Sequence, residues 1–419
     1  MRIRSVQAHL LSAPLAAPLT LSYYGGTRTI LKRDAMLIRV EAENGLVGYA
    51  PGQGSEVAKR GIDSMVAPFL EGRTLADPDA LRVQFLERAG ISADSRKLYC
   101  AVEIALYDLV GKSKGVAVSE LLGGRVRDRI RLYGSAGMYM APAQYAEEAR
   151  AIAKLGFRAY KMRPGMGPEQ DLETVRQMRE AVGPDFELMV DAHTWWRMGD
   201  RNYSLETISK LARELSQFGI AWLEEPLPPQ DHEGYRQLKN LDVVPIASGE
   251  HEPDESGYLD LIDTEAVDYI QMDVVCQGGY AAARRLFKEI DRAGLKFAFH
   301  SWGTSLEVIA AAHLGVCWQE QVVEWLEYPC YAAPGRAGMY PFPLAEEILK
   351  EPLRVENGDL LMPTGPGLGV EVDEDVLQRY PWIPGPWSFF EIDSPRETRA
   401  VTGDHSEPWF GETGSGEIR

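Results

Sequence analysis

The sequence predicts an α/β fold in which a (β/α)₈ barrel follows a smaller α+β domain. The chain has 419 residues, more than the roughly 250 that one barrel needs, so there is room for a second domain. Residues 1–126 contain strand-like segments and then helical ones, whereas residues 127–341 alternate regularly between the two. Such an alternation is typical of a parallel sheet with helices outside it.

The N-terminal domain is expected to begin with strands and to end with helices. We expect residues 1–14 to form a first strand, because polar residues interrupt the short apolar start before it could serve as a signal segment. The strand-like runs 34–40 and 46–49 flank Asn44-Gly45, a pair that favours the positive φ angles of a tight hairpin turn. Apolar residues at helical spacing then occupy residues 98–124.

Eight strand-like runs follow one another at the spacing of a barrel. Apolar residues at helical spacing separate most of them, and the clearest helix is expected over residues 143–155, before Gly156. The runs occupy residues 130–133, 159–160, 186–190, 220–223, 244–247, 269–271, 296–299 and 322–325. A closed barrel of eight β/α units is the simplest arrangement for them.

The alternation ends after Pro341. Residues 342–378 are rich in loop-forming residues, and we interpret them as a C-terminal segment that returns to the first domain. Residues 379–419 are rich in Pro, Gly and Trp and have no clear period. That tail receives no structural assignment from the sequence.

The composition restricts the class of partner. A net charge of −18 argues against binding to nucleic acid or to an anionic membrane, because those partners select a surplus of Lys and Arg. No segment approaches the roughly 18 consecutive apolar residues of a membrane-spanning helix, so we expect a soluble protein. The four cysteines have no metal-finger spacing and favour a reduced, cytoplasmic protein without disulfides: Cys100, Cys276, Cys317 and Cys330.

Ionisable residues recur at about the period of the β/α units. Nearly all of them follow a strand-like run: Lys161, Asp191, Glu224, Glu250, Asp273, His300 and Glu327. The C-terminal ends of barrel strands converge on one face. We therefore expect these side chains to share one pocket.

Three of these residues form a candidate metal site. Asp191, Glu224 and Glu250 end three successive strands, and hard carboxylate oxygens without a nearby cysteine suit Mg²⁺. A single acidic residue at a strand end is more often structural, but three in succession favour a site. In Glu224-Glu225-Pro226 only one Glu can point inward. We assign Glu224 to the metal and Glu225 to an extended, structural exit from the strand, where it could pair with a cation.

The remaining strand ends offer a base and two cations. Asp273 and His300 end neighbouring strands, and an Asp that fixes the tautomer of an imidazole makes it a general base. Taken alone, His300 would more often be a buried, hydrogen-bonded histidine. Lys161 and Arg163 face the same way on one strand, so both should enter the pocket, unless they lie at a solvated strand end. Lys161 can neutralise a substrate carboxylate. Arg163 remains protonated, so it is a poor base but a good hydrogen-bond fork for binding the substrate.

Together these motifs resemble the enolase superfamily, specifically its mandelate racemase and muconate lactonizing enzyme-like group. The resemblance covers about residues 1–378 and rests on Ala101 to Asp108, Leu121-Leu122-Gly123-Gly124, Trp222-Leu223-Glu224-Glu225-Pro226, Gly249-Glu250 and Pro366-Gly367-Leu368-Gly369. It implies a modified barrel covered by a capping domain that the N-terminal region and the C-terminal segment form. It also implies Mg²⁺ on Asp191, Glu224 and Glu250.

The resemblance implies a reaction type as well. Members of the family bind a substrate carboxylate on the metal, remove its α-proton and stabilise the enediolate. His300 and Asp273 match the family's dyad, Lys161 matches the first lysine of a Lys-x-Lys motif, and Glu327 matches the residue that hydrogen-bonds the substrate carboxylate. Arg163 departs from the pattern, because many members have a second basic lysine there.

The arginine favours one-base chemistry. If His300 alone removes the α-proton, the enediolate can expel a β-hydroxyl, and the leading hypothesis is a sugar-acid dehydratase acting on a small polyhydroxy carboxylate. A racemase, epimerase or cycloisomerase on a related carboxylate shares the same first step. A metal-binding scaffold without catalysis is the alternative of another class, and the intact dyad argues against it.

Further candidates surround this core. His193 follows Asp191 by two residues, so we expect it to face the same way on the strand. It could protonate the departing hydroxyl, and some similar dehydratases carry a histidine there, or it could merely hydrogen-bond the substrate. The resemblance places specificity in capping loops near residues 19–28 and 51–55, where Tyr23, Tyr24 and Arg28 are candidate substrate contacts. We also expect a homo-oligomer.

Overall fold

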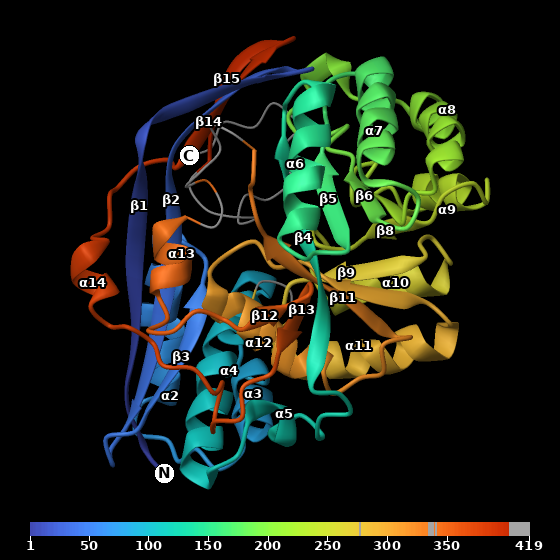
Figure 1. Ribbon diagram of the computed structural model, residues 1–419. Helices are drawn as coiled ribbons and strands as arrows, with labels where there is room; N and C mark the ends of the chain where they lie inside the picture. The colour runs from blue at the N-terminus through green and yellow to red at the C-terminus, as the bar shows by residue number, and fades with distance from the viewer. Residues whose placement is uncertain (276–277, 334–338, 340–341, 402–419) are drawn as a thin grey trace.

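The barrel is closed and parallel. The computed structural model describes residues 1–275, 278–333, 339 and 342–401. Strands β4 to β11 pair in sequence order, and β11 pairs with β4 to complete the ring (Figure 1). Their bounds are Arg129–Met138, Ala159–Arg163, Glu187–Asp191, Trp222–Glu224, Ile246–Ser248, Tyr269–Met272, Lys296–Phe299 and Val323–Pro329. Each strand overlaps one of the eight predicted runs, so the predicted fold class is confirmed.

Helices cover the outside of the barrel (Figure 1). The helix predicted over residues 143–155 is α6 (Pro142–Lys154). In α8, Ser204 accepts a hydrogen bond from the backbone N–H of Thr207 at the N-terminus, and the residues that face the barrel are apolar. The other elements of this layer are α7 (Pro168–Val182), α8 (Leu205–Leu215), α9 (His232–Lys239), α10 (Glu255–Asp263), α11 (Gly279–Ala293), α12 (Ser305–Gly315) and the short turns η2 (Gly199–Arg201) and η3 (Ser216–Phe218).

The barrel interior is filled by one buried side chain from each strand. These side chains form a separate hydrophobic cluster: Tyr133, Ala159, Met189, Trp222, Ala247, Tyr269, Ala298 and Trp325. Large and small residues are mixed around the ring, which is how the layers of a barrel fill its lumen without voids. The cluster closes the lumen from below, so that functional groups can lie only above it, toward the C-terminal ends of the strands.

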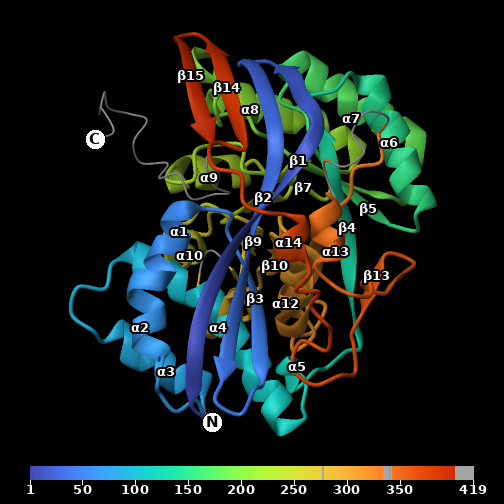
Figure 2. The ribbon, with the colours of Figure 1, turned by 90° about the vertical axis from the view of Figure 1, so that its left-hand side faces the viewer.

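A second sheet covers that end of the barrel. Its first strands are β1 (Ile3–Tyr23), β2 (Gly26–Ala42) and β3 (Val47–Gly52). Strand β2 pairs with both others, and the predicted Asn44-Gly45 turn joins it to β3. The long strands β1 and β2 pass across the front of the barrel in Figure 2. The helices of this domain are α1 (Glu56–Gly61), the π-turn η1 (Ile62–Val66), α2 (Ala67–Leu70), α3 (Pro78–Leu86), α4 (Ala93–Lys114) and α5 (Val118–Leu121).

Two expectations about this sheet need correction. The first strand does not end near residue 14 but continues to Tyr23. Residues 19–28, which we expected to form a loop, belong largely to the paired ends of β1 and β2, and only Tyr24 and Gly25 lie between the strands. Pairing with β2 continues beyond Pro14 after a register shift and resumes at Leu19, which keeps the backbone of β1 extended to Tyr23.

The C-terminal part of the chain completes both sheets. The hairpin β12 (Val355–Glu356) and β13 (Asp359–Leu361) pairs with the start of β4, and the short helices α13 (Pro343–Glu347) and α14 (Val376–Arg379) lie on either side of it in sequence. The unassigned tail contains a further hairpin, β14 (Ser388–Asp393) and β15 (Arg396–Val401), which pairs with β2. Strand β15 has no alternation of apolar residues, so only its pairing defines it. The rest of the tail lies outside the described residues.

Two expectations about the class of protein can be compared with the described residues. None of the helices in the described ranges is both long enough and apolar enough to span a bilayer. Cys100, Cys317 and Cys330 are free thiols. Cys276 lies outside the described residues.

Candidate active site

The site is built one layer above the interior cluster. Side chains alternate along a strand, so a residue two positions after a cluster residue faces the same lumen. Five of the predicted residues occupy such positions on β5, β6, β7, β10 and β11: Lys161, Asp191, Glu224, His300 and Glu327. All five are buried. The period of the strands therefore brings these groups into one pocket.

Lys161 lies at the centre of the carboxylates. Its Nζ is 2.5 Å from Glu224 Oε1, 3.1 Å from Glu327 Oε1 and 3.8 Å from Asp191 Oδ2. Burial lowers the pKa of Lys161, but the charges of Glu224, Glu327 and Asp191 outweigh it and raise that pKa above its usual value. These three carboxylates therefore favour the cationic form of Lys161.

Arg163 is held beside it by the same acids. Its Nε is 2.9 Å from Asp191 Oδ2, and one terminal nitrogen is 3.2 Å from Glu327 Oε1. The other terminal nitrogen donates to Ser135 Oγ over 3.1 Å. The guanidinium also lies 4.0 Å from the ring centre of Trp302, a cation–π contact. These contacts fix Arg163 in the pocket, and neither cation lies at a solvated strand end.

His300 and Asp273 form the expected pair. His300 Nδ1 is 3.1 Å from Asp273 Oδ2. His300 Nε2 points toward two other carboxylates, at 3.4 Å from Glu250 Oε2 and 3.8 Å from Glu327 Oε2. Burial lowers the pKa of His300, but the charges of Glu250 and Glu327 and the bond to Asp273 raise it to about 10. The imidazole is therefore protonated at neutral pH unless the negative charge around it is reduced.

Glu327 joins the two sides of the pocket. It approaches Lys161 and Arg163 through Oε1, while Oε2 accepts a hydrogen bond of 2.9 Å from the backbone N–H of Ser301. Burial raises the pKa of Glu327, but the charges of Lys161, His300 and Arg163 lower it to about 2. Glu327 is therefore a permanent anion.

The three predicted metal ligands end successive strands of the barrel, although they are not the set whose ligand atoms all lie within 4.8 Å of one another among the described residues. Asp191 and Glu224 are partners in the register of β6 and β7, and Glu250 follows β8. Burial and then the charges of Glu224 and Glu250 raise the pKa of Asp191 well above its usual range. Trp222 Nε1 donates to Glu224 Oε2 over 2.8 Å and orients that carboxylate. Close carboxylates that repel one another are a donor set that a hard divalent cation would stabilise.

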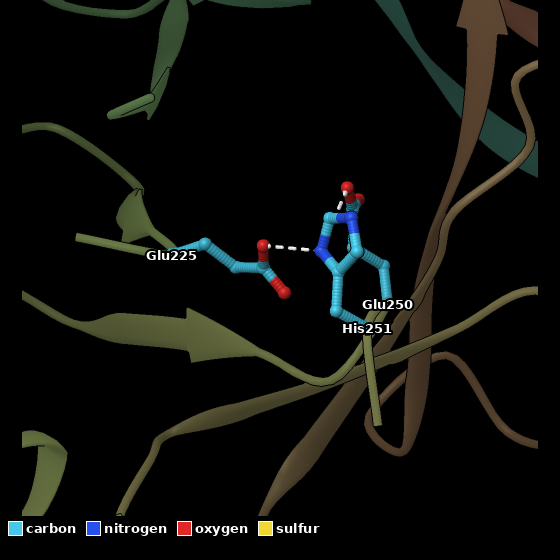
Figure 3. A group of neighbouring side chains, drawn as sticks. All are labelled: Glu225, Glu250 and His251. Carbon is cyan, nitrogen blue, oxygen red and sulfur yellow. Dashed lines mark hydrogen bonds and ion pairs between the residues drawn. The ribbon is translucent and has the colours of Figure 1, made fainter. Parts of the chain in front are cut away.

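A second group overlaps this one. Glu225, Glu250 and His251 offer ligand atoms that all lie within 4.8 Å of one another. Figure 3 shows His251 between the two carboxylates, with Nδ1 2.6 Å from Glu225 Oε2 and 3.6 Å from Glu250 Oε1. Burial lowers the pKa of His251 to about 4, so the imidazole is neutral. Glu250 belongs to both groups.

Glu225 departs from the sequence expectation. Its backbone is not extended but has a φ of 39°, and this left-handed turn brings the side chain back to His251. Non-glycine residues with positive φ also follow β4 and β6, at Tyr139, His193 and Arg197. Such strained residues persist where the surrounding structure over-determines them, often at functional sites. Local strand alternation could not have revealed this turn.

Mg²⁺ fits the residues present. Three buried carboxylates offer oxygen donors, and Lys161 and Arg163 balance only part of the negative charge of Asp191, Glu224, Glu250, Asp273 and Glu327. A group with two carboxylates and an imidazole, as in Figure 3, suits Zn²⁺ as well as Mg²⁺. The all-oxygen set of Asp191, Glu224 and Glu250 remains the one we expect to hold Mg²⁺.

His193 lies beside the proposed ligands. Its Nε2 is 3.5 Å from Asp191 Oδ1, and its Nδ1 is buried without a hydrogen-bond partner among the described residues. Its backbone has a φ of 51°, so the residue is in a turn and not in the strand phase that we assumed. Burial and the charge of Arg163 lower its pKa well below the usual value.

The capping sheet reaches the dyad. A small cavity of about 20 Å³ is bounded by Asp273, His300 and Trp302 from the barrel and by residues 51–53 and Asp34 from the cap. This volume suffices for about one water molecule. The predicted capping loop near residues 51–55 therefore borders the candidate base.

The other capping candidates lie in different surroundings. Arg28 is buried and donates to Met138 Sδ at the end of β4. The Tyr23 hydroxyl donates to the backbone oxygen of Arg197. The ring of Tyr24 packs against Tyr203 and under the guanidinium of Arg201. Substrate contact by these residues remains a prediction.

Three contributors to the site escaped the sequence analysis. Trp302 stacks on Arg163, His251 pairs with Glu225, and the Ser301 backbone binds Glu327. Each lies one or two positions after a predicted site residue, in the loop that follows His300 or Glu250. Closeness in sequence to a predicted residue is the signal that could have identified them. Only the fold shows which partners they meet.

Known families match almost the whole of the described chain. The family model described as mandelate racemase / muconate lactonizing enzyme, N-terminal domain, matches residues 7–123, and the model described as enolase C-terminal domain-like matches residues 144–376. The second match alone spans more than half of the chain.

The individual relatives described next each share less than 30% sequence identity with this chain. The D-galactarolactone cycloisomerase of Agrobacterium fabrum is 27% identical over 398 residues, which cover 91% of this chain and 99% of the relative. The D-xylonate dehydratase of Haloferax volcanii is 28% identical over 372 residues, covering 82% and 85%. The crystal structure of a putative mandelate racemase from Bordetella bronchiseptica, complexed with 2-oxoglutarate and phosphate, superimposes with a TM-score of 0.81 at 28% identity and covers 92% of this chain and 99% of that one. With its barrel, its capping sheet and its convergent acids, the chain belongs to the enolase superfamily of enzymes, in the mandelate racemase and muconate lactonizing enzyme-like group.

Proposed function

We propose that the protein is an Mg²⁺-dependent dehydratase of a sugar acid. It would remove the α-proton of a polyhydroxy carboxylate and eliminate the β-hydroxyl as water, which gives a 2-keto-3-deoxy acid. The names of two relatives, a dehydratase and a cycloisomerase of sugar-derived acids, support this class of reaction.

The proposal depends on the number of side chains in the pocket that could act as a base toward the α-carbon. A racemase needs a base on each face of the α-carbon, but the second cation of β5 is Arg163, whose guanidinium is a poor base and is paired with Asp191 and Glu327. His300, which directly follows β10, is paired with Asp273 and directs its other ring nitrogen toward Glu250 and Glu327, so it is the candidate base. A single base favours elimination, because the proton removed need not be returned to the opposite face.

His300 would take the α-proton through Nε2. Its Nδ1 faces Asp273, whereas its Nε2 faces the pocket near Glu250 and Glu327. The charge of Glu250 is the largest of those that raise the His300 pKa. A divalent cation on Glu250 would offset that charge and so favour the neutral, basic imidazole at neutral pH.

The remaining side chains have distinct tasks. When bound by Asp191, Glu224 and Glu250, Mg²⁺ would polarise the substrate carboxylate and stabilise the charge that develops on it. Lys161 adds a fixed positive charge beside those oxygens. As the bond between the β-carbon and its hydroxyl oxygen breaks, the leaving oxygen needs a proton, which His193 or the protonated His300 could supply.

A screen of sugar acids tests the proposal. The protein with Mg²⁺ should convert at least one aldonate or aldarate into a 2-keto acid that has lost one water. The His300→Asn variant should lower kcat about 10²- to 10⁴-fold, the usual effect of removing a general base. His232→Asn is a matched control, because that histidine lies outside the pocket, bound to Glu252 and Asp260. Unchanged turnover by His300→Asn would overturn the assignment of the base.

Solvent exchange and product mass separate the competing reactions. In D₂O a racemase or epimerase would return substrate of inverted configuration that contains deuterium, without a 2-keto product. A cycloisomerase, the reaction named for the Agrobacterium relative, would give a product of the same mass as its lactone substrate. Either result would replace the dehydratase while leaving the role of His300 intact.

A further inference from the structure

A cavity of about 460 Å³ lies on the outer side of the barrel, where the capping domain meets helix α11. Its walls come from α3 and the residue after α5 in the cap, and from α11 and the turn after α12 in the barrel. None of the residues predicted for the active site lines it. The volume is in the range of cavities that bind small molecules.

Among the described residues, four cations and one carboxylate line this cavity. Arg82 comes from α3, Arg284, Arg285 and Lys288 come from α11, and the carboxylate is Asp79. The local excess of cations is opposite to the net charge of −18 of the whole chain. Arg284 and Lys288 are four residues apart on one face of α11, and like charges at that spacing repel each other. An anion between them would relieve this repulsion.

Carboxylates orient the two arginines of α11 from behind. One terminal nitrogen of Arg284 donates to Asp79 Oδ2. Arg285 binds Glu255 through Nε and one terminal nitrogen, over 2.9 and 2.7 Å. The other terminal nitrogen of each arginine, and Nζ of Lys288, have no hydrogen-bond or ion-pair partner among the described residues. Three donors on one helix therefore remain for a ligand.

Arg82 adds a charge from the capping domain. The residue is only 9% exposed, and its Nε lies 3.4 Å from Glu103 Oε2. Burial raises the pKa of Glu103 to about 7, so this carboxyl offsets the charge of Arg82 only in part at neutral pH. A terminal nitrogen of Arg82 donates to the backbone oxygen of Gly278, directly before α11, over 3.4 Å. The cap and the helix with the free donors thus meet at this cavity.

An apolar wall accompanies the cations. Val83 of α3 is exposed, Leu122 is buried, and Trp318 is partly buried with its ring edge-on to Phe287. All but Phe287 line the cavity. Apolar surface beside a few convergent polar groups suits a ligand that has both kinds of group.

We propose that this cavity binds a small phosphate ester at a site separate from the active site. A phosphate dianion has three terminal oxygens, one for each free donor of Arg284, Arg285 and Lys288, and it would cancel their mutual repulsion. A carboxylate offers only two oxygens and a single charge. Trp318 would contact the organic group of the ester.

Calorimetric titration with inorganic phosphate and with phenyl phosphate tests the site. The full-length protein with Mg²⁺ is used at constant ionic strength and at about pH 8, where phosphate groups are dianions. We expect both probes to bind saturably. Arg285→Gln/Lys288→Gln should weaken both about 10-fold or more, because it removes two of the three free donors. Trp318→Ala should weaken phenyl phosphate about 3- to 10-fold, by loss of an aromatic contact, and leave inorganic phosphate unchanged.

Arg236→Gln/Arg292→Gln is the matched control. It removes the same charge from arginines of α9 and α11 that do not line the cavity and pair with Glu233 and Glu289, and it should bind both probes as the wild type does. Circular dichroism and thermal unfolding would show that each variant is folded.

Three results would overturn the site. Unchanged affinity in Arg285→Gln/Lys288→Gln would mean that phosphate binds elsewhere, such as the barrel pocket. An equal loss in the control would mean that binding responds only to overall charge. A wild type that binds neither probe saturably would exclude a phosphate site altogether. Equal losses of both probes in Trp318→Ala would overturn the place given to the organic group. All of these outcomes leave the proposed function standing.

Discussion

His313 shows how one buried imidazole can join the barrel to the cap. It lies on α12 and is fully buried. Its Nδ1 accepts a hydrogen bond from the backbone N–H of Ser119, which fixes the proton on Nε2, and Nε2 donates to the backbone oxygen of Leu368. Burial lowers the pKa of His313 to about 4. The folded protein therefore holds the neutral form.

This histidine should make the protein less stable as the pH falls. Below its ordinary pKa of 6.5 the imidazole of the unfolded chain gains a proton, whereas the folded one does not until about pH 4. The unfolded state then binds more protons, so the free energy of unfolding should fall by about 2 kcal/mol between pH 7 and pH 5. Urea unfolding of the wild type and of His313→Gln at both pH values measures this contribution as a difference.

The wild type must be compared with His313→Gln because other buried groups make the free energy of unfolding rise, not fall, as the pH is lowered. Burial raises the pKa of Glu103 and of Asp171 to about 7, so their contributions to stability grow as the pH falls below 7. These contributions are common to the wild type and the variant and cancel. Equal losses of stability in the two proteins would show that His313 does not titrate as its surroundings predict.

At the scale of elements, the contact between β2 and β14 depends on a glycine. Gly26 begins β2 with a φ of 153°, and a Cβ built there would lie 2.0 Å from the backbone oxygen of Glu391 in β14. Gly45, in the turn between β2 and β3, has a φ of 85° but nothing within 4 Å of such a Cβ. Both glycines therefore have a positive φ, but only at Gly26 would an added Cβ collide with a neighbouring strand.

Gly26→Ala should consequently destabilise the protein more than Gly45→Ala. Gly45→Ala should cost about 1 kcal/mol, through backbone strain alone. Gly26→Ala must also displace a paired backbone, for which we expect about 3 kcal/mol in total. Thermal unfolding measures both, and limited proteolysis should cut the Gly26→Ala protein within residues 388–401 sooner than the control. Equal effects of the two substitutions would mean that β14 can shift freely.

At the scale of the whole molecule, metal binding should stabilise the fold through three strand ends at once. A ligand that binds only the folded state adds about 2.7 kcal/mol at a hundred times its dissociation constant. We expect Mg²⁺ to raise the unfolding temperature of the wild type and of His251→Asn, but not that of Asp191→Asn. Unfolding followed by circular dichroism, with and without Mg²⁺, provides a measurement that is independent of activity.

The opposite pattern would identify the other group of ligands. If His251→Asn lost the effect of Mg²⁺ and Asp191→Asn kept it, the cation would belong to Glu225, Glu250 and His251. The two substitutions replace side chains at strand ends of one barrel, so each serves as the control for the other.

The sequence by itself determined the barrel and much of its pocket. Each barrel strand has a short apolar run, and residues such as Lys161, Asp191 and His300 follow at a fixed phase from the side chain that fills the lumen. Since side chains alternate along every strand, local order decides which residues enter the pocket. The same regularity allowed the eight strands to be recognised before any contact between them was known.

Only the tertiary structure decided what those residues meet. The turn at Glu225 toward His251, the ion pair from Lys161 on β5 to Glu327 on β11 and the hydrogen bond from Arg28 on β2 to Ser388 on β14 all join segments far apart in the chain. Local periodicity has no information about such partners, because the energy that holds Glu225 in its strained backbone or β15 in its extended form comes from contacts with other elements.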